Sequence, residues 1–201
     1  MVAPATLAVP HHPTPAAELD RARFGLVIYL TSKAMFFVAL IGAYLVLSQT
    51  QSWPPPGTKA LSAARALPAT ALLLLSGATA LVAPIAIRKG RLEAARIGVA
   101  VTFMLGAIFV GVQVAEWFDL YADGLRGTSY AQFFYVLTGF HLLYIVTGLA
   151  MFAVVIVRAR AGRYDAERHV GIDLSTLWWH FCGAVWLVLF GAIYLYPELL
   201  R

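Results

Sequence analysis

The sequence predicts an all-α, polytopic membrane protein in which five transmembrane helices form one bundle. Of its 201 residues, 61% are hydrophobic and 12% are charged, whereas soluble domains carry about 25% charged residues. The mean hydropathy is +0.77. Five continuous apolar windows are each long enough to cross a hydrocarbon layer of ~30 Å, which needs roughly 20 helical residues. The windows are residues 24–47, 67–87, 97–115, 133–157 and 174–196.

The same composition excludes several other classes of protein. A transmembrane β-barrel needs segments of about ten alternating residues, and these apolar runs are continuous. A disulfide scaffold is excluded because Cys182 is the single cysteine. The formal net charge of +5 is explained by the positive-inside rule, since basic residues orient membrane proteins. We therefore expect no nucleic-acid partner.

The residues before the first window differ from the rest of the chain. They contain four prolines and little apolar periodicity, so we expect residues 1–23 to form an extended tail on the membrane surface. The positively charged start and compact apolar core of a cleavable signal peptide are not evident there. The transmembrane domain is expected to cover residues 24–201.

Prolines also mark the ends of the first two spans. Three of them follow Trp53 and forbid a helix there, while Trp53 itself suits the headgroup belt. Pro68, at the start of the second window, is tolerated in a first helical turn. Pro84, near the far end of the same window, predicts a bend.

The distribution of Lys and Arg predicts the orientation of the chain. The N-terminal tail and the second and fourth loops together hold ten of these residues, whereas the opposite side holds four. By the positive-inside rule, the N-terminus and these two loops lie in the cytoplasm. Five crossings then place the C-terminus outside. Anionic lipid headgroups are the expected neighbours of the basic loops.

Lys33 is the ionisable residue that lies deepest in a span. It is ten residues into the first window, which at 1.5 Å per residue is ~15 Å below the surface. Charged groups at this depth mark functional sites or satisfied contacts between helices. Lys33 is therefore either a neutral or paired lysine facing the bundle interior or part of a proton or ion relay. We expect it to pair with an acceptor or to contact a lipid phosphate.

Gln113 and Glu116 lie three residues apart at the outer end of the third window, on one helix face. Trp117 and Asp119 follow them. This position near the interface favours a water-accessible hydrogen-bonding cluster, and a buried relay is the alternative.

Two histidines lie inside the predicted spans. His141 is ~13 Å below the outer surface, with Tyr144 one helical turn later on the same face, and His180 is ~9 Å above the inner surface. In a core of ~30 Å these depths leave at least ~8 Å between the two imidazoles. We therefore expect each histidine to hydrogen-bond across helices, and we expect this chain to bind no metal.

Small and aromatic residues supply the packing candidates. Six glycines are expected to allow close approach of helices, and the aromatic residues of the last two windows are expected mostly to face lipid or to anchor the interface. The glycines are Gly106, Gly111, Gly139, Gly148, Gly183 and Gly191, and the aromatics are Phe133, Phe134, Tyr135, Phe140, Trp178, Trp179 and Trp186. Trp53, Arg88, Trp179, Gly183 and Trp186 are the candidates for lipid contact or packing.

Several short motifs occur in a fixed order along these windows. They are Gln113-Val114-Ala115-Glu116-Trp117, Tyr130-Ala131-Gln132-Phe133-Phe134, Thr138-Gly139-Phe140-His141, Trp179-His180-Phe181 and Val185-Trp186-Leu187. Their order and spacing resemble subunit III of the haem-copper cytochrome c oxidases. Met35-Phe36-Phe37 and the Trp53-Pro54-Pro55 turn resemble the bacterial branch of that family, and His169-Val170-Gly171 resembles the loop before its last helix. The likeness covers residues 24–196.

The resemblance implies a helical subunit with no redox centre of its own, packed against the catalytic subunit I that carries haem and copper, in a complex that includes subunit II. It implies a bacterial cytoplasmic membrane protein that holds structural phospholipid, supports proton uptake into subunit I and protects the active site during turnover. Longer family members have seven spans in two bundles around a lipid-filled cleft. This chain resembles the short form that lacks the first two helices, so one wall of that cleft is missing.

Three residues depart from the family pattern. Lys33 stands where a glutamate is usual, Tyr144 where a second histidine follows the first, and Gly183 where an aspartate is usual. Functions that need a carboxylate at these points are therefore not carried over to this chain.

Two other functions compete with the oxidase subunit. One is an accessory subunit of a nitric oxide reductase, and the other is a small transporter that uses Lys33 and Glu116. The cytoplasmic loop also allows two interpretations, as a set of exchangeable protons near the uptake entrance or as a solvated loop that sets topology, and we favour the second. Its titratable residues are Asp165, Glu167, His169 and Asp173.

Overall fold

The computed structural model describes residues 14–58 and 61–199, and within these ranges it contains helices and no strand. Five helical stretches are long and apolar enough to cross a membrane, as the sequence predicts. The elements are α1 (Pro15–Thr50), α2 (Ala63–Ala80), α3 (Val82–Arg88), α4 (Leu92–Ala122), α5 (Ser129–Arg160), α6 (Val170–Phe190), the π-helical η1 (Gly191–Leu195) and α7 (Tyr196–Leu199). The second span joins α2 with α3, and the fifth joins α6 with η1 and α7.

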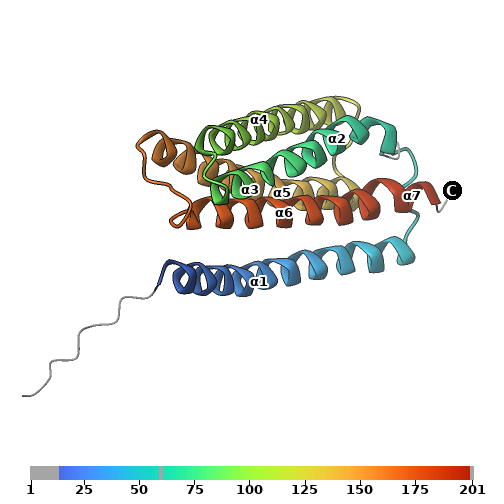
Figure 1. Cartoon of the computed structure of the whole chain (residues 1–201). Helices are drawn as coiled ribbons and strands as arrows, with labels where there is room; N and C mark the ends of the chain where they lie inside the picture. Colours follow the sequence, from blue (N-terminus) through green and yellow to red (C-terminus); the bar gives the residue numbers. More distant parts are fainter. Residues whose placement is uncertain (1–13, 59–60, 200–201) are drawn as a thin grey trace, which may run out of the picture.

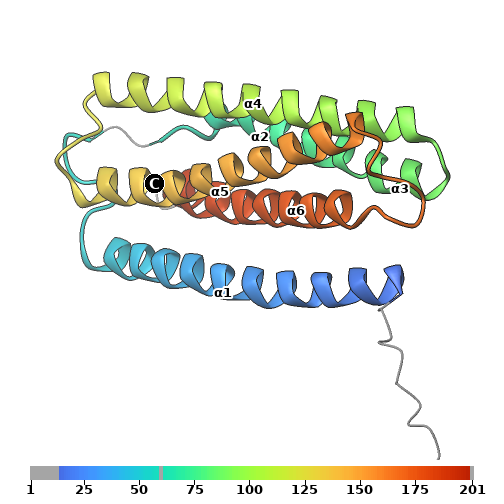
Figure 2. The same cartoon turned by 90° about the vertical axis from the view of Figure 1, so that its left-hand side faces the viewer.

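Four spans form the bundle, and α1 lies beside it. Helices α2 to α6 pack on one another, whereas α1 runs along one side of the bundle against α6 and, less closely, α5 (Figure 1). Figure 2 shows α1 and α4 on opposite sides of the molecule. Leu30, Phe37 and Tyr44 are the buried apolar residues of α1, and their seven-residue spacing places them on a single stripe of the helix.

Helix α1 begins before its apolar window because capping signals extend it into polar sequence. Helix α1 begins at Pro15, where Thr14 Oγ1 accepts a hydrogen bond from the Ala17 amide, and Glu18 lies in its first turn. These are favourable residues for a helix N-terminus. Residues 15–23 are therefore helical, and the expectation of an extended chain there is wrong. Residues 1–13 lie outside the described residues, and their division into a cytoplasmic tail stays a prediction.

The predicted bend in the second span is confirmed at Leu81, which separates α2 from α3. Pro84 has no amide hydrogen, so the Ala80 carbonyl lacks its usual helical donor. Thr176 Oγ1 on α6 donates to this carbonyl at 3.4 Å. Pro68 lies inside α2 and not in its first turn, because the helix begins four residues earlier than the window.

The tryptophans of α6 are buried, so the expectation that Trp178, Trp179 and Trp186 face lipid is wrong. Each indole nitrogen has a partner inside the bundle. Trp179 donates to Ser76 Oγ at 2.9 Å, Trp186 donates to Thr70 Oγ1 at 3.0 Å, and Trp178 donates to the Tyr144 carbonyl at 2.9 Å. The bundle thus supplies each indole N–H with an acceptor, which hydrocarbon does not offer. Of the α5 aromatics, Phe134 is also buried, whereas Phe140 is exposed and Phe133 and Tyr135 are half-buried.

Two of the six glycines make the close approach that was expected. A Cβ on Gly106 would lie 2.5 Å from the Trp179 ring, and one on Gly148 would lie 2.8 Å from the same ring. Trp179 therefore fits between α4 and α5 only because both helices carry glycine there. A Cβ on Gly139 would make ordinary contact with Trp117, and one on Gly111, Gly183 or Gly191 would meet no atom within 4 Å. The packing expectation is thus wrong for these last three glycines within this chain.

Trp53 packs at the end of the bundle where α1 turns back. Its ring contacts Tyr44 and Tyr130 edge to face, with both centroids at 5.1 Å, and its exposed fraction is 8%. Neighbouring rings thus cover the indole within this chain, and the place of Trp53 in the headgroup belt stays a prediction. At the same end, Tyr196 binds α1 through Gln49 Nε2 and through Ser48 Oγ at 3.3 Å.

Candidate functional site

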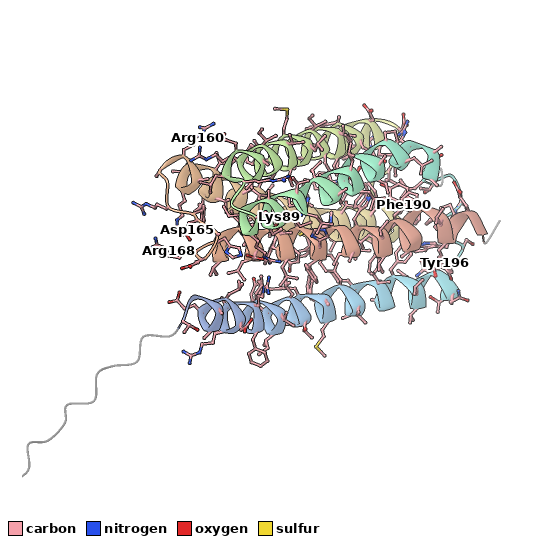
Figure 3. The ribbon with its side chains drawn as sticks, in the orientation of Figure 1. Lys89, Arg160, Asp165, Arg168, Phe190 and Tyr196 are labelled. Carbon is pink, nitrogen blue, oxygen red and sulfur yellow. The ribbon has the colours of Figure 1, made fainter. Side chains whose placement is uncertain are left out.

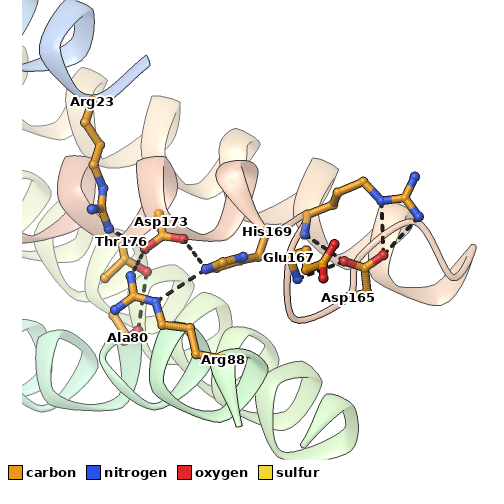
Figure 4. Close-up of polar contacts among 9 residues, drawn as sticks. Arg23, Ala80, Arg88, Asp165, Glu167, His169, Asp173 and Thr176 are labelled. Atoms are coloured by element: carbon orange, nitrogen blue, oxygen red, sulfur yellow. Dashed lines mark hydrogen bonds and ion pairs between the residues drawn. The ribbon is translucent and has the colours of Figure 1, made fainter. Parts of the chain in front are cut away.

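The polar side chains form several separate groups. The largest group joins α1 to the bundle. Arg23 of α1, Arg88 of α3, and His169 and Asp173 at the start of α6 form what we call the Asp173 cluster (Figure 4). Three separate helices thus meet on one carboxylate. Among the described residues, the ion pair between α1 and another helix is the one that Arg23 forms in this cluster.

Asp173 is the centre of this cluster. Arg23 Nη2 donates to Asp173 Oδ1 at 2.7 Å, and Arg88 Nη2 donates to the same oxygen. The Nε of Arg88 donates to His169 Nε2 at 3.3 Å, and that nitrogen lies 3.3 Å from Asp173 Oδ2. Only 3% of the Asp173 side chain is exposed, against 39% of Arg23 and 49% of Arg88. The carboxylate is therefore buried under two guanidinium groups whose outer edges stay accessible.

An open pocket of about 520 Å³ adjoins the cluster between α1 and the loop before α6. Its polar walls come from Arg23, Arg88, Glu167 and His169. Two arginines share one aspartate, so the cluster keeps a positive charge with the histidine neutral. Partly exposed guanidinium groups suit a phosphate because they offer paired N–H donors in one plane. The pocket therefore offers two guanidinium groups to an anion, with the Glu167 carboxylate also in its wall.

The four titratable residues in the loop between α5 and α6 and at the start of α6 do not form one surface. His169 and Asp173 are buried in the cluster, so the expectation of a wholly solvated loop is wrong for them. Asp165 instead shapes the loop, since its carboxylate accepts hydrogen bonds from the Arg168 and Glu167 amides. These bonds hold the pKa of Asp165 below its usual value, because they stabilise the charged form.

Lys33 lies on the side of α1 that faces the bundle, between the buried Leu30 and Phe37. Its ammonium sits over the Tyr29 ring, 4.9 Å from the centroid, and Tyr29 in turn stacks on Trp178. Within residues 14–58 and 61–199, Lys33 makes no hydrogen bond or ion pair, so a cation–π contact takes the place of the expected acceptor. Pairing with a lipid phosphate or with another subunit stays a prediction.

Tyr144 belongs to the same seam between α1 and the bundle. Its ring meets Phe37 edge to face at 5.5 Å and Trp178 at 6.0 Å. Phe37 follows Lys33 by one helical turn. Two of the three departures from the family pattern, Lys33 and Tyr144, thus line the contact of α1 with α5 and α6.

The two intramembrane histidines have different surroundings. His141 is buried between the rings of Phe109 and Trp186, and its Nε2 lies 3.1 Å from the Cys182 carbonyl on α6, which confirms the expected bond across helices. His180 Nδ1 lies 2.8 Å from the Thr176 carbonyl of its own helix, so the same expectation is wrong for His180. In the part of the chain that the structure describes, no three His, Cys, Asp or Glu side chains come together as a possible metal site.

Glu116 and Gln113 form a buried pair at the opposite end of the bundle from the Asp173 cluster. Gln113 Nε2 donates to Glu116 Oε2 at 3.1 Å, and Tyr194 of η1 donates to Glu116 Oε1 at 3.3 Å. All three side chains are buried, so the expectation of a water-accessible cluster is wrong. Tyr194 was not singled out in the sequence, since the pattern of apolar residues does not reveal a π-helical turn. Such turns are frequent at functional sites.

Replacing Glu116 by leucine is expected to destabilise the chain by about 1–2 kcal/mol, because Gln113 and Tyr194 would lose their buried acceptor. Glu116→Gln retains an acceptor and is expected to cost less than about 1 kcal/mol. The measurement is the midpoint temperature of thermal unfolding of the purified chain. Asp119→Asn, one turn away and exposed, is the control. Equal midpoints for Glu116→Leu and Asp119→Asn would contradict the buried pair.

The fold and its polar sites define a multi-pass helical membrane protein whose helices are joined by a buried aspartate with its two arginines and by buried tryptophans. The chain matches the family Cytochrome c oxidase subunit III over residues 2–198. It is 35% identical over 173 residues to a cytochrome c oxidase subunit 3 of Thermostichus vulcanus, with 85% of each chain covered. It is also 35% identical over 187 residues to the subunit 3 of Synechocystis, covering 92% of this chain and 78% of the relative. The subunit 3 of Cyprinus carpio is 32% identical over 194 residues, which cover 92% of this chain and 72% of the relative.

The chain therefore belongs to the cytochrome c oxidase subunit III family. It is a subunit III of a haem-copper oxidase, and its working form is a complex with other oxidase subunits. The resemblance drawn from the motifs is confirmed over nearly the whole chain.

Proposed function

We propose that this chain binds the catalytic subunit I, beside subunit II, in a bacterial cytoplasmic membrane with its N-terminus in the cytoplasm. Haem and copper are then held by the partner subunits. The chain keeps phospholipid beside subunit I, supports proton uptake from the cytoplasmic side and protects the active site during turnover. The count of ten basic residues against four supports this orientation.

The observation that carries the proposal is the pocket between α1 and the bundle, whose wall holds the guanidinium groups of Arg23 and Arg88. Helix α1 is joined to the bundle by the Asp173 cluster at one end and by Tyr196 at the other. In the proposed orientation the pocket opens at the level of the cytoplasmic headgroups, where Arg23 and Arg88 present their exposed edges. A phospholipid phosphate fits this charge, and its acyl chains would follow the apolar surface of α1.

The chain's membership of the subunit III family favours an oxidase over a nitric oxide reductase or a transporter. A transporter would work alone in liposomes, whereas a subunit III requires a haem-bearing partner. Co-purification of this chain with a partner that shows a haem absorption spectrum, and reduces oxygen, is the expected result. Reduction of nitric oxide alone would overturn the assignment to an oxidase.

The lipid site is tested with a double substitution, Arg23→Gln with Arg88→Gln, in the purified complex. We expect less retained phospholipid and fewer turnovers before inactivation, because two donors to the phosphate are lost. Added phospholipid is expected to restore part of the turnover lifetime. Arg91→Gln is the matched control, since Arg91 lies at the same end of the bundle and outside the pocket.

Two outcomes would contradict the proposal. One is unchanged lipid content and turnover lifetime in the double variant when the chain remains in the complex. The other is full activity, proton uptake and lifetime in complex from which this chain has been removed. The amount of this chain in each preparation is measured by gel, which separates a lost lipid site from a lost subunit.

A further inference from the structure

A second hollow lies between α4 and α5, away from α1. Its volume is about 200 Å³, and its walls include Ile97 and Ala100 of α4 and Ile156 of α5. Arg96 and Arg160 stand at its mouth. Figure 2 shows α4 on the side of the bundle opposite α1, and Figure 3 shows Arg160 at the end of the bundle where α5 meets its loop. No residue of the pocket beside α1 takes part in this groove, which we call the α4–α5 groove.

The two arginines differ in how they are held. Arg96 Nη1 lies 2.6 Å from Glu93 Oε1, and its Nη2 donates to the Ala159 carbonyl at 2.8 Å, so the side chain is fixed across the mouth of the groove. Arg160 makes no hydrogen bond or ion pair within the described residues and is exposed. Glu93 neutralises Arg96 alone, so the unpaired Arg160 leaves this end of the groove with a net positive charge.

The groove itself is apolar and faces the membrane. Ile97 at its edge is 62% exposed, and in a spanning helix that surface meets hydrocarbon. Water gains no hydrogen bonds in such a hollow, so an apolar group fills it at lower free energy. The groove combines apolar walls with two arginines at one end, and this pairing favours an apolar chain that carries an anionic headgroup.

We propose that the α4–α5 groove binds an anionic phospholipid, with one acyl chain along Ile97, Ala100 and Ile156 and the phosphate between Arg160 and Arg96. The charge at the mouth selects an anionic headgroup, and the apolar walls select the lipid over a free phosphate. Arg96 keeps its bond to Ala159 and positions the headgroup with its exposed edge. Arg160, which has no hydrogen-bond or ion-pair partner among the described residues, supplies most of the selectivity.

The probe is phosphatidylglycerol with a photoactivatable group on one acyl chain, added to the purified oxidase complex in lipid nanodiscs. Mass spectrometry of the labelled peptides is expected to find adducts around residues 97–100 and 156. Arg160→Gln is expected to lower the labelling about fivefold, which corresponds to one basic residue at an anionic surface. Arg158→Gln is the matched control, because Arg158 lies two residues earlier on α5 and does not line the groove. Ala100→Trp, which fills the groove, is expected to abolish the adducts.

Three results would overturn the proposal. They are equal labelling by the phosphatidylcholine analogue, equal labelling of Arg160→Gln and Arg158→Gln, and contact of these residues with a partner subunit that excludes the probe. The Arg23→Gln and Arg88→Gln double variant is expected to leave the labelling unchanged, so a failure here is distinct from a failure of the pocket beside α1.

Discussion

Asp173→Asn is expected to destabilise the chain by about 2–3 kcal/mol and to loosen α1 from the bundle. The substitution leaves Arg23 and Arg88 without the carboxylate that both of them bind. Breaking a buried ion pair costs about 3–5 kcal/mol, and we expect less here because the two arginines are partly exposed and screened by solvent. The measurement is the midpoint temperature for loss of this chain from the complex.

Asp123→Asn is the matched control for this prediction. Arg65 and Asp123 form an ion pair at 3.3 Å in which both side chains are nearly half exposed, and such pairs contribute about 0–1 kcal/mol. The looser α1 is followed by cross-linking between cysteines placed on α1 and α6, which is expected to fall in Asp173→Asn alone. Similar midpoints for the two variants would show that the Asp173 cluster does not hold α1 in place.

Gly148→Ala is expected to destabilise the bundle by about 1–3 kcal/mol, because overpacking of a close-packed core has costs of this size. The added Cβ would lie 2.8 Å from the Trp179 ring and 2.9 Å from the Trp178 ring. Neither ring has room to move, since both are buried and hydrogen-bonded. The same dissociation midpoint is the measurement, and tryptophan fluorescence reports any shift of the rings.

Gly183→Ala is the control, and its expected effect on stability has the opposite sign. A Cβ there meets no atom within 4 Å, and alanine is better than glycine in a helix by about 0.5–1 kcal/mol. The midpoint is therefore expected to rise slightly or to stay unchanged. A fall in Gly183→Ala as large as that of Gly148→Ala would mean that another subunit packs against Gly183.

The five spans were predictable because each is a long, continuous apolar run that only a helix can carry through hydrocarbon. The bend at Pro84 was predictable for a local reason as well, since a proline removes a particular amide. The ends of the helices were predicted less accurately. Helix α1 begins at Pro15, after the Thr14 cap and before the apolar window. Hydropathy alone does not detect capping residues.

The candidate site was predicted only in parts. Lys33, Glu116, His141 and Arg88 were identified as polar residues in or beside apolar spans, which depends only on composition along the chain. Their partners were not predictable, because Asp173 meets Arg23 from 150 residues away and Tyr194 meets Glu116 from 78 residues away. The positions of Trp179 and Trp186 were misjudged for the same reason, since nothing local shows which side of α6 is covered.

The sequence alone determined that this is a membrane protein, how many helices span the membrane and, through its ordered motifs, the family to which it belongs. These properties depend on residues close together along the chain. Only the tertiary structure decided that α1 stands beside the bundle, that two arginines share Asp173 and that Trp179 occupies the space left by Gly106 and Gly148. In a membrane every span is apolar on most of its surface, so hydropathy does not distinguish the face that meets lipid from the face that meets protein. Shape and hydrogen bonding between helices make that distinction.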